Sequence, residues 1–279
     1  MKKDGHTHTR FSHHGSQEPL DLYLERAIEL GFTDYVVTEH APLPEAFLAT
    51  YTGPRSQDDD SAMLASELQA YKAEVARVKA KYGDQIRIHQ GFEVDYLPGY
   101  EAETKAFLQE NADWIDEIVL SVHFLENDSG LIGPIDYDPD QLKRFFPMEL
   151  QDPQALFNKY LTMVQQSIDF DTGLSTPVRI GHITLIRKFQ KYFDFPDFDL
   201  ENQQKITAIL TSILEKGYEL DVNAAGLRKE FCGESYPDAK ILRQAVALQV
   251  PMIYGSDAHT VADLGLSYDE LAASVHLKS

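Results

Sequence analysis

Hydrophobic positions along the chain form short β-branched runs, which alternate with longer stretches where apolar residues recur every three or four positions. The short runs predict seven strands, at residues 5–8, 34–38, 86–93, 117–123, 178–182, 218–223 and 251–255. The longer stretches predict helices at residues 19–30, 60–82, 101–111, 153–168, 200–216 and 238–249. Residues 41–60 and 126–150 are rich in Pro, Gly and Asp, which is typical of long loops.

This alternation of strands and helices predicts an α/β fold of parallel βαβ units. Because their crossovers are right-handed, such units close naturally into a barrel, and seven strands predict a distorted or incomplete (β/α) barrel. The 279 residues are 43% hydrophobic, which is enough for one large core. We find no internal repeat, low-complexity block or linker, so we expect residues 1–279 to form a single domain.

Charge and composition narrow the classes of partner. Acidic residues outnumber basic ones by 45 to 25, and the net charge of −20 predicts a surface that repels nucleic acids and anionic membranes. No apolar run reaches the roughly 18 residues of a membrane span, and the first residues lack the apolar segment of a secretory signal. The single cysteine, Cys232, cannot form an internal disulfide. We therefore expect a cytoplasmic protein with a small-molecule substrate.

Residues of metal-ligand type follow almost every expected strand. One histidine at a strand end is usually an ordinary loop residue, but the C-terminal ends of parallel barrel strands share one face, where active sites lie. On this face the sequence places His6, His8, His14, His40, Glu93, His123, His182, Asp257 and His259. Of the other histidines, His89 lies inside a strand and is expected to be structural, and His276 is expected to be solvated. Spacing alone does not choose between His13 and His14.

The size of this set indicates several metal ions. A catalytic zinc typically keeps about three protein ligands, so the set exceeds one ion and overfills two. If the carboxylate of Glu93 bridges two ions, the set suits three. Imidazole and carboxylate ligands without thiolate suit zinc, manganese or iron, and the sequence leaves the choice open.

The segments that carry these residues resemble the PHP (polymerase and histidinol phosphatase) superfamily, and specifically its histidinol-phosphate phosphatases. The matching segments run in the family's order from residue 6 to residue 260: HTHTRFSHHG, TEHAPLP, QGFEVDY, LSVHFL, RIGHITLIRKF, LDVNAAGLRK and GSDAHT. The resemblance implies a distorted (β/α)7 barrel with three divalent ions at its C-terminal rim. It assigns the first ion to His6, His8, Glu93 and Asp257, the second to Glu93, His123 and His182, and the third to His14, His40 and His259.

A trinuclear centre suits the hydrolysis of phosphate monoesters. The ions can neutralise phosphate oxygens, lower the pKa of a bound water towards about 7 and stabilise the leaving oxygen. The nucleophile would be a metal-bound hydroxide, so no phosphoenzyme is needed. The expected catalytic residues are Glu93, Asp257 and His259, and either Asp257 or a metal-held histidine would handle the proton.

The resemblance also places phosphate-binding arginines in two of these segments, at Arg187 and Arg228. The planar guanidinium offers a fork of donors that matches phosphate oxygens. The neighbouring Lys188 and Lys229 are expected to be supporting or solvated charges. Asn223 would either bind substrate or order its loop.

The leading hypothesis is a phosphatase that converts L-histidinol phosphate to L-histidinol and phosphate in histidine biosynthesis. One alternative is another PHP phosphoesterase, acting on a nucleotide or a phosphotyrosine protein, and a second is a non-catalytic metal-binding module. The cationic end of histidinol phosphate would need acidic partners, for which the rim offers Glu18, Asp21 and Asp95. The oligomeric state remains open.

Overall fold

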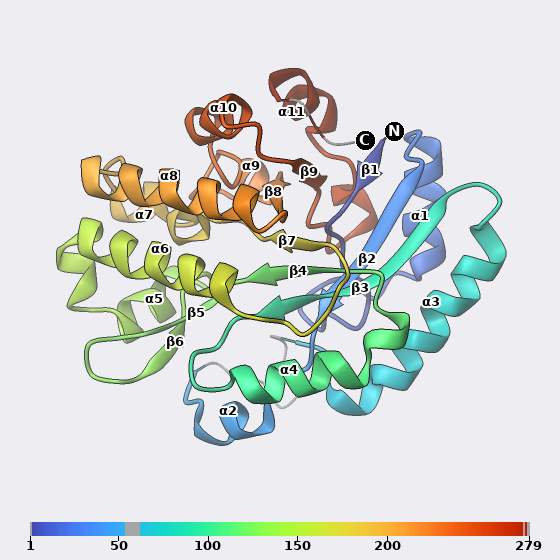
Figure 1. Ribbon diagram of the computed structural model, residues 1–279, viewed down its shortest axis with the longest axis horizontal. Coiled ribbons are helices and arrows are strands. Elements are labelled where there is room, and N and C mark those ends of the chain that lie inside the picture. Colours follow the sequence, from blue (N-terminus) through green and yellow to red (C-terminus); the bar gives the residue numbers. More distant parts are fainter. Residues whose placement is uncertain (1, 54–61, 276, 278–279) are drawn as a thin grey trace.

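The computed structural model describes residues 2–53, 62–275 and 277. In this part of the chain, seven parallel strands form one sheet in the order β1-β2-β3-β4-β7-β8-β9 (Figure 1). Their bounds are β1 Lys3–Asp4, β2 Asp34–His40, β3 Arg87–Asp95, β4 Glu117–Ser121, β7 Val178–Ile180, β8 Glu219–Asn223 and β9 Met252–Gly255. The predicted parallel sheet is confirmed.

The sheet closes where the chain after β1 meets the chain after β9. The backbone N–H of Gly5 donates to Tyr254 O (2.8 Å), and the N–H of Asp257 donates to His6 O (2.8 Å). Thr7 also forms an isolated parallel bridge with Ala258. The result is a nearly closed seven-stranded barrel, as the strand count predicts.

The first strand ends earlier than the sequence predicts. Regular pairing with β2 stops at Asp4, and residues 5–8 bond in part to the loop after β9 and to the side chain of Thr38. The His-x-His segment therefore lies beyond the regular strand, in the seam that closes the barrel.

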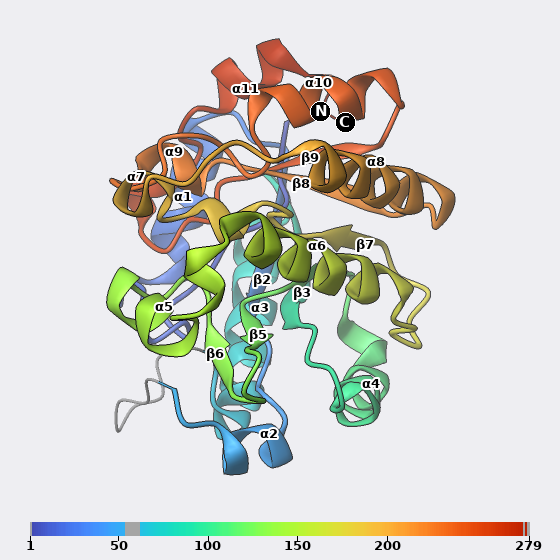
Figure 2. The same ribbon diagram turned by 90° about the vertical axis from the view of Figure 1, so that its left-hand side faces the viewer.

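Helices cover the outside of the barrel (Figures 1 and 2). The α-helices are α1 Leu20–Glu29, α2 Glu45–Thr50, α3 Leu68–Tyr82, α4 Glu101–Glu110, α5 Pro139–Phe145, α6 Pro153–Asp169, α7 Gln190–Phe193, α8 Leu200–Glu215, α9 Ala225–Arg228, α10 Ala239–Ala247 and α11 Tyr268–Ser274. Short 3₁₀ turns are η1 Ala65–Glu67, η2 Ala112–Trp114, η3 Glu149–Gln151, η4 Leu185–Arg187 and η5 Val261–Asp263. The side chains of Asp152, Asp199 and Asp238 cap the N-termini of α6, α8 and α10.

The two predicted loops contain structure that their composition hides. Residues 41–60 include α2, and residues 126–150 include α5 and an antiparallel hairpin of β5 (Phe124–Glu126) and β6 (Ile132–Pro134). Gly130 lies in the turn between β5 and β6, and Asp138 and Pro139 begin α5. The helix expected from residue 60 begins as η1 at Ala65, and Asp60 lies outside the described residues.

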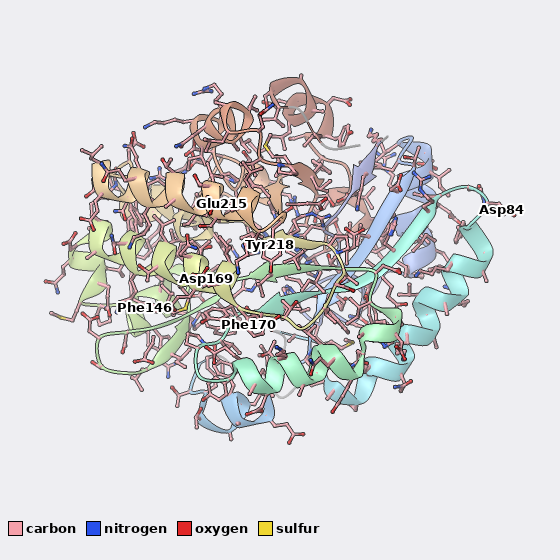
Figure 3. All side chains as sticks on the ribbon, viewed as in Figure 1. Asp84, Phe146, Asp169, Phe170, Glu215 and Tyr218 are labelled. Carbon is pink, nitrogen blue, oxygen red and sulfur yellow. The ribbon has the colours of Figure 1, made fainter. Side chains whose placement is uncertain are left out.

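Side chains fill the space between the strands and the helices (Figure 3). Asp169, Phe170, Glu215 and Tyr218, labelled there, mark the turns that lead from α6 and α8 into β7 and β8. At this N-terminal end of the barrel, the fully buried guanidinium of Arg179 donates to Glu117 (2.7 Å) and Glu219 (3.1 Å). In the described part of the chain, no helix is both long and apolar enough to cross a membrane.

Candidate metal centre

The carboxylate of Glu93 lies at the centre of the opposite, C-terminal end of the barrel. Glu93 is in β3 and is only 2% exposed. Five histidine nitrogens surround its two oxygens: His6 Nε2 (3.1 Å), His8 Nε2 (3.4 Å) and His40 Nδ1 (3.2 Å) at Oε2, and His182 Nε2 (2.8 Å) and His123 Nε2 (3.6 Å) at Oε1. They follow or end four strands, β1, β2, β4 and β7, as the barrel geometry predicts.

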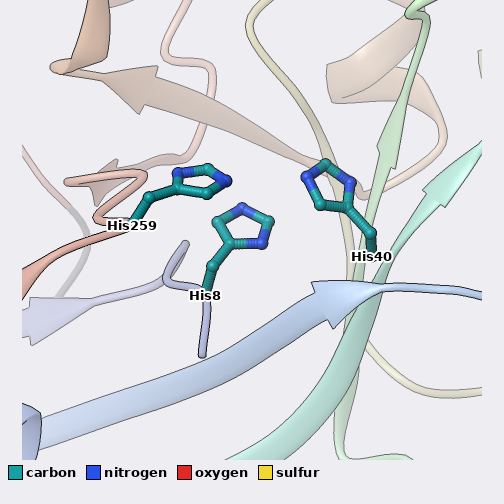
Figure 4. Close-up of side chains that lie close together, drawn as sticks. All are labelled: His8, His40 and His259. Atoms are coloured by element: carbon teal, nitrogen blue, oxygen red, sulfur yellow. The ribbon is translucent and has the colours of Figure 1, made fainter. Parts of the chain in front are cut away.

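The remaining predicted ligands adjoin this group through His8. The His8 ring lies between those of His40 (4.3 Å between centroids) and His259 (4.1 Å), as Figure 4 shows. His8 Nε2 is 3.3 Å from Asp257 Oδ1, and His14 Nε2 is 2.8 Å from His259 Nε2. The structure thus brings together all nine residues predicted to bind metal.

The unsatisfied polar atoms of the cluster fit divalent cations. His6 Nε2, His8 Nε2 and His40 Nδ1 are buried, have no hydrogen-bond partner among the described residues, and face the same oxygen of Glu93. Buried polar atoms are normally hydrogen-bonded, so this convergence is typical of nitrogens that bind cations. Four groups could each hold an ion: His8/His40/His259, His6/His8/Glu93, His40/Asp95/His123 and Glu93/His123/His182.

Carboxylates fix the orientation of three of the histidine rings. His6 Nδ1 is 2.8 Å from Asp221 Oδ2, and His123 Nδ1 is 2.8 Å from Asp95 Oδ1. The same contact joins His8 Nδ1 to Oε1 of Glu39, at 3.3 Å. A metal-binding histidine commonly donates its other N–H to such a carboxylate, which fixes the tautomer that leaves the second nitrogen free for the metal.

The charges in the cluster suit metal binding. Burial disfavours ionisation of Glu93, but the positive charge of neighbouring histidines, with His6 the largest contributor, outweighs burial and holds the pKa of Glu93 well below the usual value. Burial, and then the charge of His8, hold the pKa of His40 and of His259 well below the usual value. Burial lowers the pKa of His6 and His123, but neighbouring carboxylates outweigh burial and raise the pKa of each to about 10, so a divalent cation would displace their protons on binding.

Two residues predicted to contact substrate instead hold Asp257. Arg228 donates to Ser256 O (3.0 Å) and Asp257 O (2.8 Å), where Asp257 adopts a left-handed backbone conformation (φ 51°). The side-chain N–H of Asn223 donates to the carboxylates of Asp221 (3.1 Å) and Asp257 (3.2 Å). Neither Arg228 nor Asn223 lines the cavity above the cluster, and the contacts of Asn223 fit the loop-ordering alternative.

That cavity has a volume of about 390 Å³, and its floor is the cluster. Aromatic side chains form part of its wall, namely Tyr51, Phe124 and Tyr137. Its charged residues outside the cluster and Asp95 are Asp136, Lys188 and Lys229. Lys188 Nζ lies 3.0 Å from Asp136 Oδ2, whereas the ammonium of Lys229 has no hydrogen-bond or ion-pair partner among the described residues.

Arg187, predicted to bind phosphate, does not line this cavity. Arg187 ends the 3₁₀ turn η4, in which side chains three residues apart lie on the same side. Leu185 and Lys188 therefore face the cavity, and Arg187 points elsewhere. Its guanidinium donates to Glu234 Oε1 (3.1 Å) and to Pro196 O (2.9 Å), beside a separate cavity.

The same displacement by one residue occurs after β8. There the chain forms the short helix α9, in which residues four apart share a face. Ala225 and Lys229 line the cavity, whereas Arg228 is turned towards the backbone of Asp257. In both segments a lysine, and not the predicted arginine, reaches the site.

The remaining histidines lie apart from the centre. His13 Nε2 is 2.8 Å from Glu67, which leaves His14 as the member of the cluster. His89, predicted to be structural, lies 3.6 Å from both Asp34 and Glu117. His276 lies outside the described residues.

Of the three acids suggested for the cationic end of a substrate, only Asp95 borders the cavity. Glu18 accepts a hydrogen bond from the backbone of Val261 (2.9 Å). Asp21 pairs with Lys81 (2.6 Å) on the outer surface. Asp136, which also borders the cavity, was not identified from the sequence, because it lies in the segment 126–150 that was predicted to be a long loop.

Comparison with known proteins agrees with the residue pattern. The PHP domain profile matches residues 4–225. The histidinol-phosphatase of Bacillus subtilis is 37% identical over 269 residues, which cover 96% of this chain and 97% of that protein. The histidinol-phosphatase of Saccharomyces cerevisiae is 23% identical over 95% of this chain and 85% of its own.

Solved structures share the fold. A Listeria monocytogenes protein, provisionally assigned as a histidinol phosphatase, superposes with a TM-score of 0.91 at 41% identity, covering 96% of this chain and 99% of that one. The histidinol phosphate phosphatase of Lactococcus lactis, solved with zinc, L-histidinol and phosphate, has a TM-score of 0.67 at 20% identity, over 98% and 92% of the two chains. The chain belongs to the PHP domain family.

Proposed function

We propose that this chain is a metal-dependent phosphatase that hydrolyses L-histidinol phosphate to L-histidinol and inorganic phosphate. The observation that carries the proposal is the cluster of buried, unpaired histidine nitrogens around Glu93, at the floor of a cavity that also contains two lysines. The 37% identity to a histidinol-phosphatase over nearly the whole length supports the choice of substrate. We place the reaction in the cytoplasm, because a chain with one cysteine cannot form an internal disulfide and so fits a reducing compartment.

We assign three divalent ions, of zinc, manganese or iron, to the cluster. Glu93 would be shared between the ion at His6, His8 and Asp257 and the ion at His123 and His182, and a third would lie at His14, His40 and His259. When bound, such ions supply Lewis acidity that neutralises phosphate oxygens and acidifies water.

The two lysines of the cavity are the phosphate-binding residues in this proposal. Burial, and then the like charge of Lys188, lower the pKa of Lys229, and no carboxylate pairs with Lys229 in the described chain. An anion placed between the two ammonium groups would relieve their repulsion. Arg228 then acts indirectly, because it holds the backbone of Asp257 and does not contact the phosphate.

Proton handling falls to Asp257 and His259, which both border the cavity. The Nδ1–H of His259 donates to the carbonyl oxygen of Asp257 (3.1 Å). This bond fixes the tautomer of the ring, and burial keeps the ring neutral by lowering its pKa well below the usual value. His259 thereby positions Asp257, whose carboxylate would pass the proton to the leaving oxygen.

Phosphate release from a panel of monoesters, with metal content measured on the same sample, tests the proposal. The panel contains histidinol phosphate, nucleoside monophosphates, a phosphotyrosine peptide and p-nitrophenyl phosphate. We expect close to three ions per chain and the highest kcat/KM for histidinol phosphate. A tenfold preference for a nucleotide or the peptide would exclude this substrate, and metal binding without phosphate release would indicate a binding module.

A further inference from the structure

Asp136 is held firmly in the wall of the cavity, close to the metal cluster. It follows β6, and the adjacent N–H of Ile135 donates to His123 O (2.9 Å). This bond joins the hairpin to the end of the strand that carries a candidate ligand. The Asp136 side chain is 22% exposed, so it is largely shielded from water but accessible from the cavity.

The other carboxylates that line the cavity are already committed. Glu93 and Asp257 belong to the cluster, and Asp95 lies 2.8 Å from His123 Nδ1. Asp136 instead pairs with Lys188 at 3.0 Å, and this is its hydrogen-bond and ion-pair partner in the described chain. The cavity therefore presents a carboxylate and an ammonium side by side, and neither is needed to hold a metal.

We infer that Asp136 binds the ammonium group of the substrate and thereby determines specificity, an inference that rests on the proposed phosphatase function. In histidinol phosphate the carbon that bears the ammonium is directly attached to the CH₂ of the phosphate ester. The two opposite charges of the substrate are therefore close together, as are those of Asp136 and Lys188. Binding exchanges the internal ion pair for two pairs with the substrate, phosphate to Lys188 and ammonium to Asp136.

The same exchange discriminates against esters without a cation. The phosphate of an ester without a cation would draw Lys188 away from Asp136, and the ester would offer no positive charge to the Asp136 carboxylate in its place. A carboxylate left in a largely buried wall without a counter-charge is unfavourable, and such penalties give charged pairs their specificity.

The aromatic side chains of the cavity accommodate the other end of the substrate. Phe124 packs edge-on against Tyr51 with centroids 5.5 Å apart, and both are anchored against Phe47. A planar imidazole, attached through a further CH₂, can pack against such a wall, since aromatic pairs are favourable in edge-on or offset arrangements.

The test compares two substrates with variants of Asp136. The substrates are L-histidinol phosphate and its deamino analogue 3-(imidazol-4-yl)propyl phosphate, which differs only by the ammonium group. We expect the wild-type chain to prefer histidinol phosphate by about ten- to a hundredfold in kcat/KM, the range of a charge-assisted hydrogen bond. In D136N we expect most of this preference to disappear, with unchanged metal content and undiminished activity on the analogue.

Asp128→Asn is the matched control. It removes the same charge and another carboxylate–lysine pair, with Lys159 (2.5 Å), but its side chain is 71% exposed and outside the cavity. The preference should be that of the wild type in this variant. Asp136→Glu, which keeps the charge, should retain part of the preference and provides a second variant if D136N is poorly folded.

The outcomes separate the inference from the function on which it rests. If D136N lowers kcat/KM equally for both substrates, Asp136 merely positions Lys188 and the inference is wrong. An unchanged preference in D136N and Asp136→Glu would also overturn it, while leaving the phosphatase intact. A wild-type chain that hydrolyses other esters but not histidinol phosphate overturns the proposed function and the inference together.

Discussion

Replacing Lys229 and Arg187 separately by methionine distinguishes the two candidate phosphate sites. Methionine removes the charge of either side chain and keeps much of its apolar length. Lys229 borders the cavity without a counter-ion among the described residues, whereas Arg187 is 6% exposed and bonded to Glu234 and to a backbone carbonyl. The structure therefore predicts opposite phenotypes for two cations that the sequence alone ranks the other way round.

The magnitudes follow from what each side chain contacts. Loss of a charge-assisted hydrogen bond from Lys229 to phosphate is worth about 1.5–3 kcal/mol, or about ten- to a hundredfold in kcat/KM. Folding stability should be unchanged or slightly higher, because the repulsion with Lys188 is relieved. Arg187→Met should lower the free energy of unfolding by about 1–3 kcal/mol, since Glu234 is 32% exposed and water can replace its partner.

The assay combines steady-state kinetics on histidinol phosphate, urea unfolding and metal analysis. We expect Lys229→Met to lose kcat/KM at full metal content and full stability. Arg187→Met should lose stability and keep kcat/KM within about threefold. The reverse result, a stable Arg187→Met with a hundredfold defect and a fully active Lys229→Met, would refute the assignment of phosphate binding to the lysines.

Three further predictions concern the metal centre, the pH profile and the barrel interior. Glu93→Gln should lose metal and activity together, whereas His89→Ala should keep both; elemental analysis that finds full metal in Glu93→Gln would rule out a shared carboxylate. Burial lowers the pKa of Lys229, so its ammonium group loses its proton at a lower pH than that of an ordinary lysine. The variant Lys229→Arg stays protonated and should therefore move the basic limb of the kcat/KM profile to higher pH. If the limb does not move, it reports the titration of another group. Arg179→Met should lower the free energy of unfolding by about 3–5 kcal/mol, because Glu117 loses a buried partner; urea unfolding measures the loss, and one below about 1 kcal/mol would contradict it.

The barrel and the set of clustered residues could be predicted because both depend on regular periodicities. Parallel strands deliver their C-terminal ends to one face, so His40, Glu93 and His182 meet regardless of loop conformation. The first strand was predicted less well, because residues 5–8 pair on two sides in an irregular seam. No local sequence pattern predicts how the ends of a barrel sheet meet.

The role of acids in orienting the histidine rings was not predicted, although the sequence contained a signal for two of these acids. Asp95 lies two residues after Glu93 on β3, and Asp221 lies two residues before Asn223 on β8. Residues two apart on a strand point to the same side, so the strand geometry predicts that both acids face the cluster. Their pairing with His123 and His6 depends on neighbouring strands, which the sequence order of the barrel also supplies.

Lysines line the cavity where arginines were predicted, and the reason lies in the local backbone conformation. No element was predicted directly after β7 and β8, so the sequence did not indicate which of two adjacent residues faces a ligand. They are helical turns, so a residue's direction is fixed by its distance from the strand end, and the positions three or four beyond Leu185 and Ala225 face inwards. Both inward positions are lysines. The arginines beside them are turned by about a third of a revolution, towards Glu234 in one case and the backbone of Asp257 in the other. A one-residue shift therefore separates the lysines that line the cavity from the arginines that bond to its surroundings.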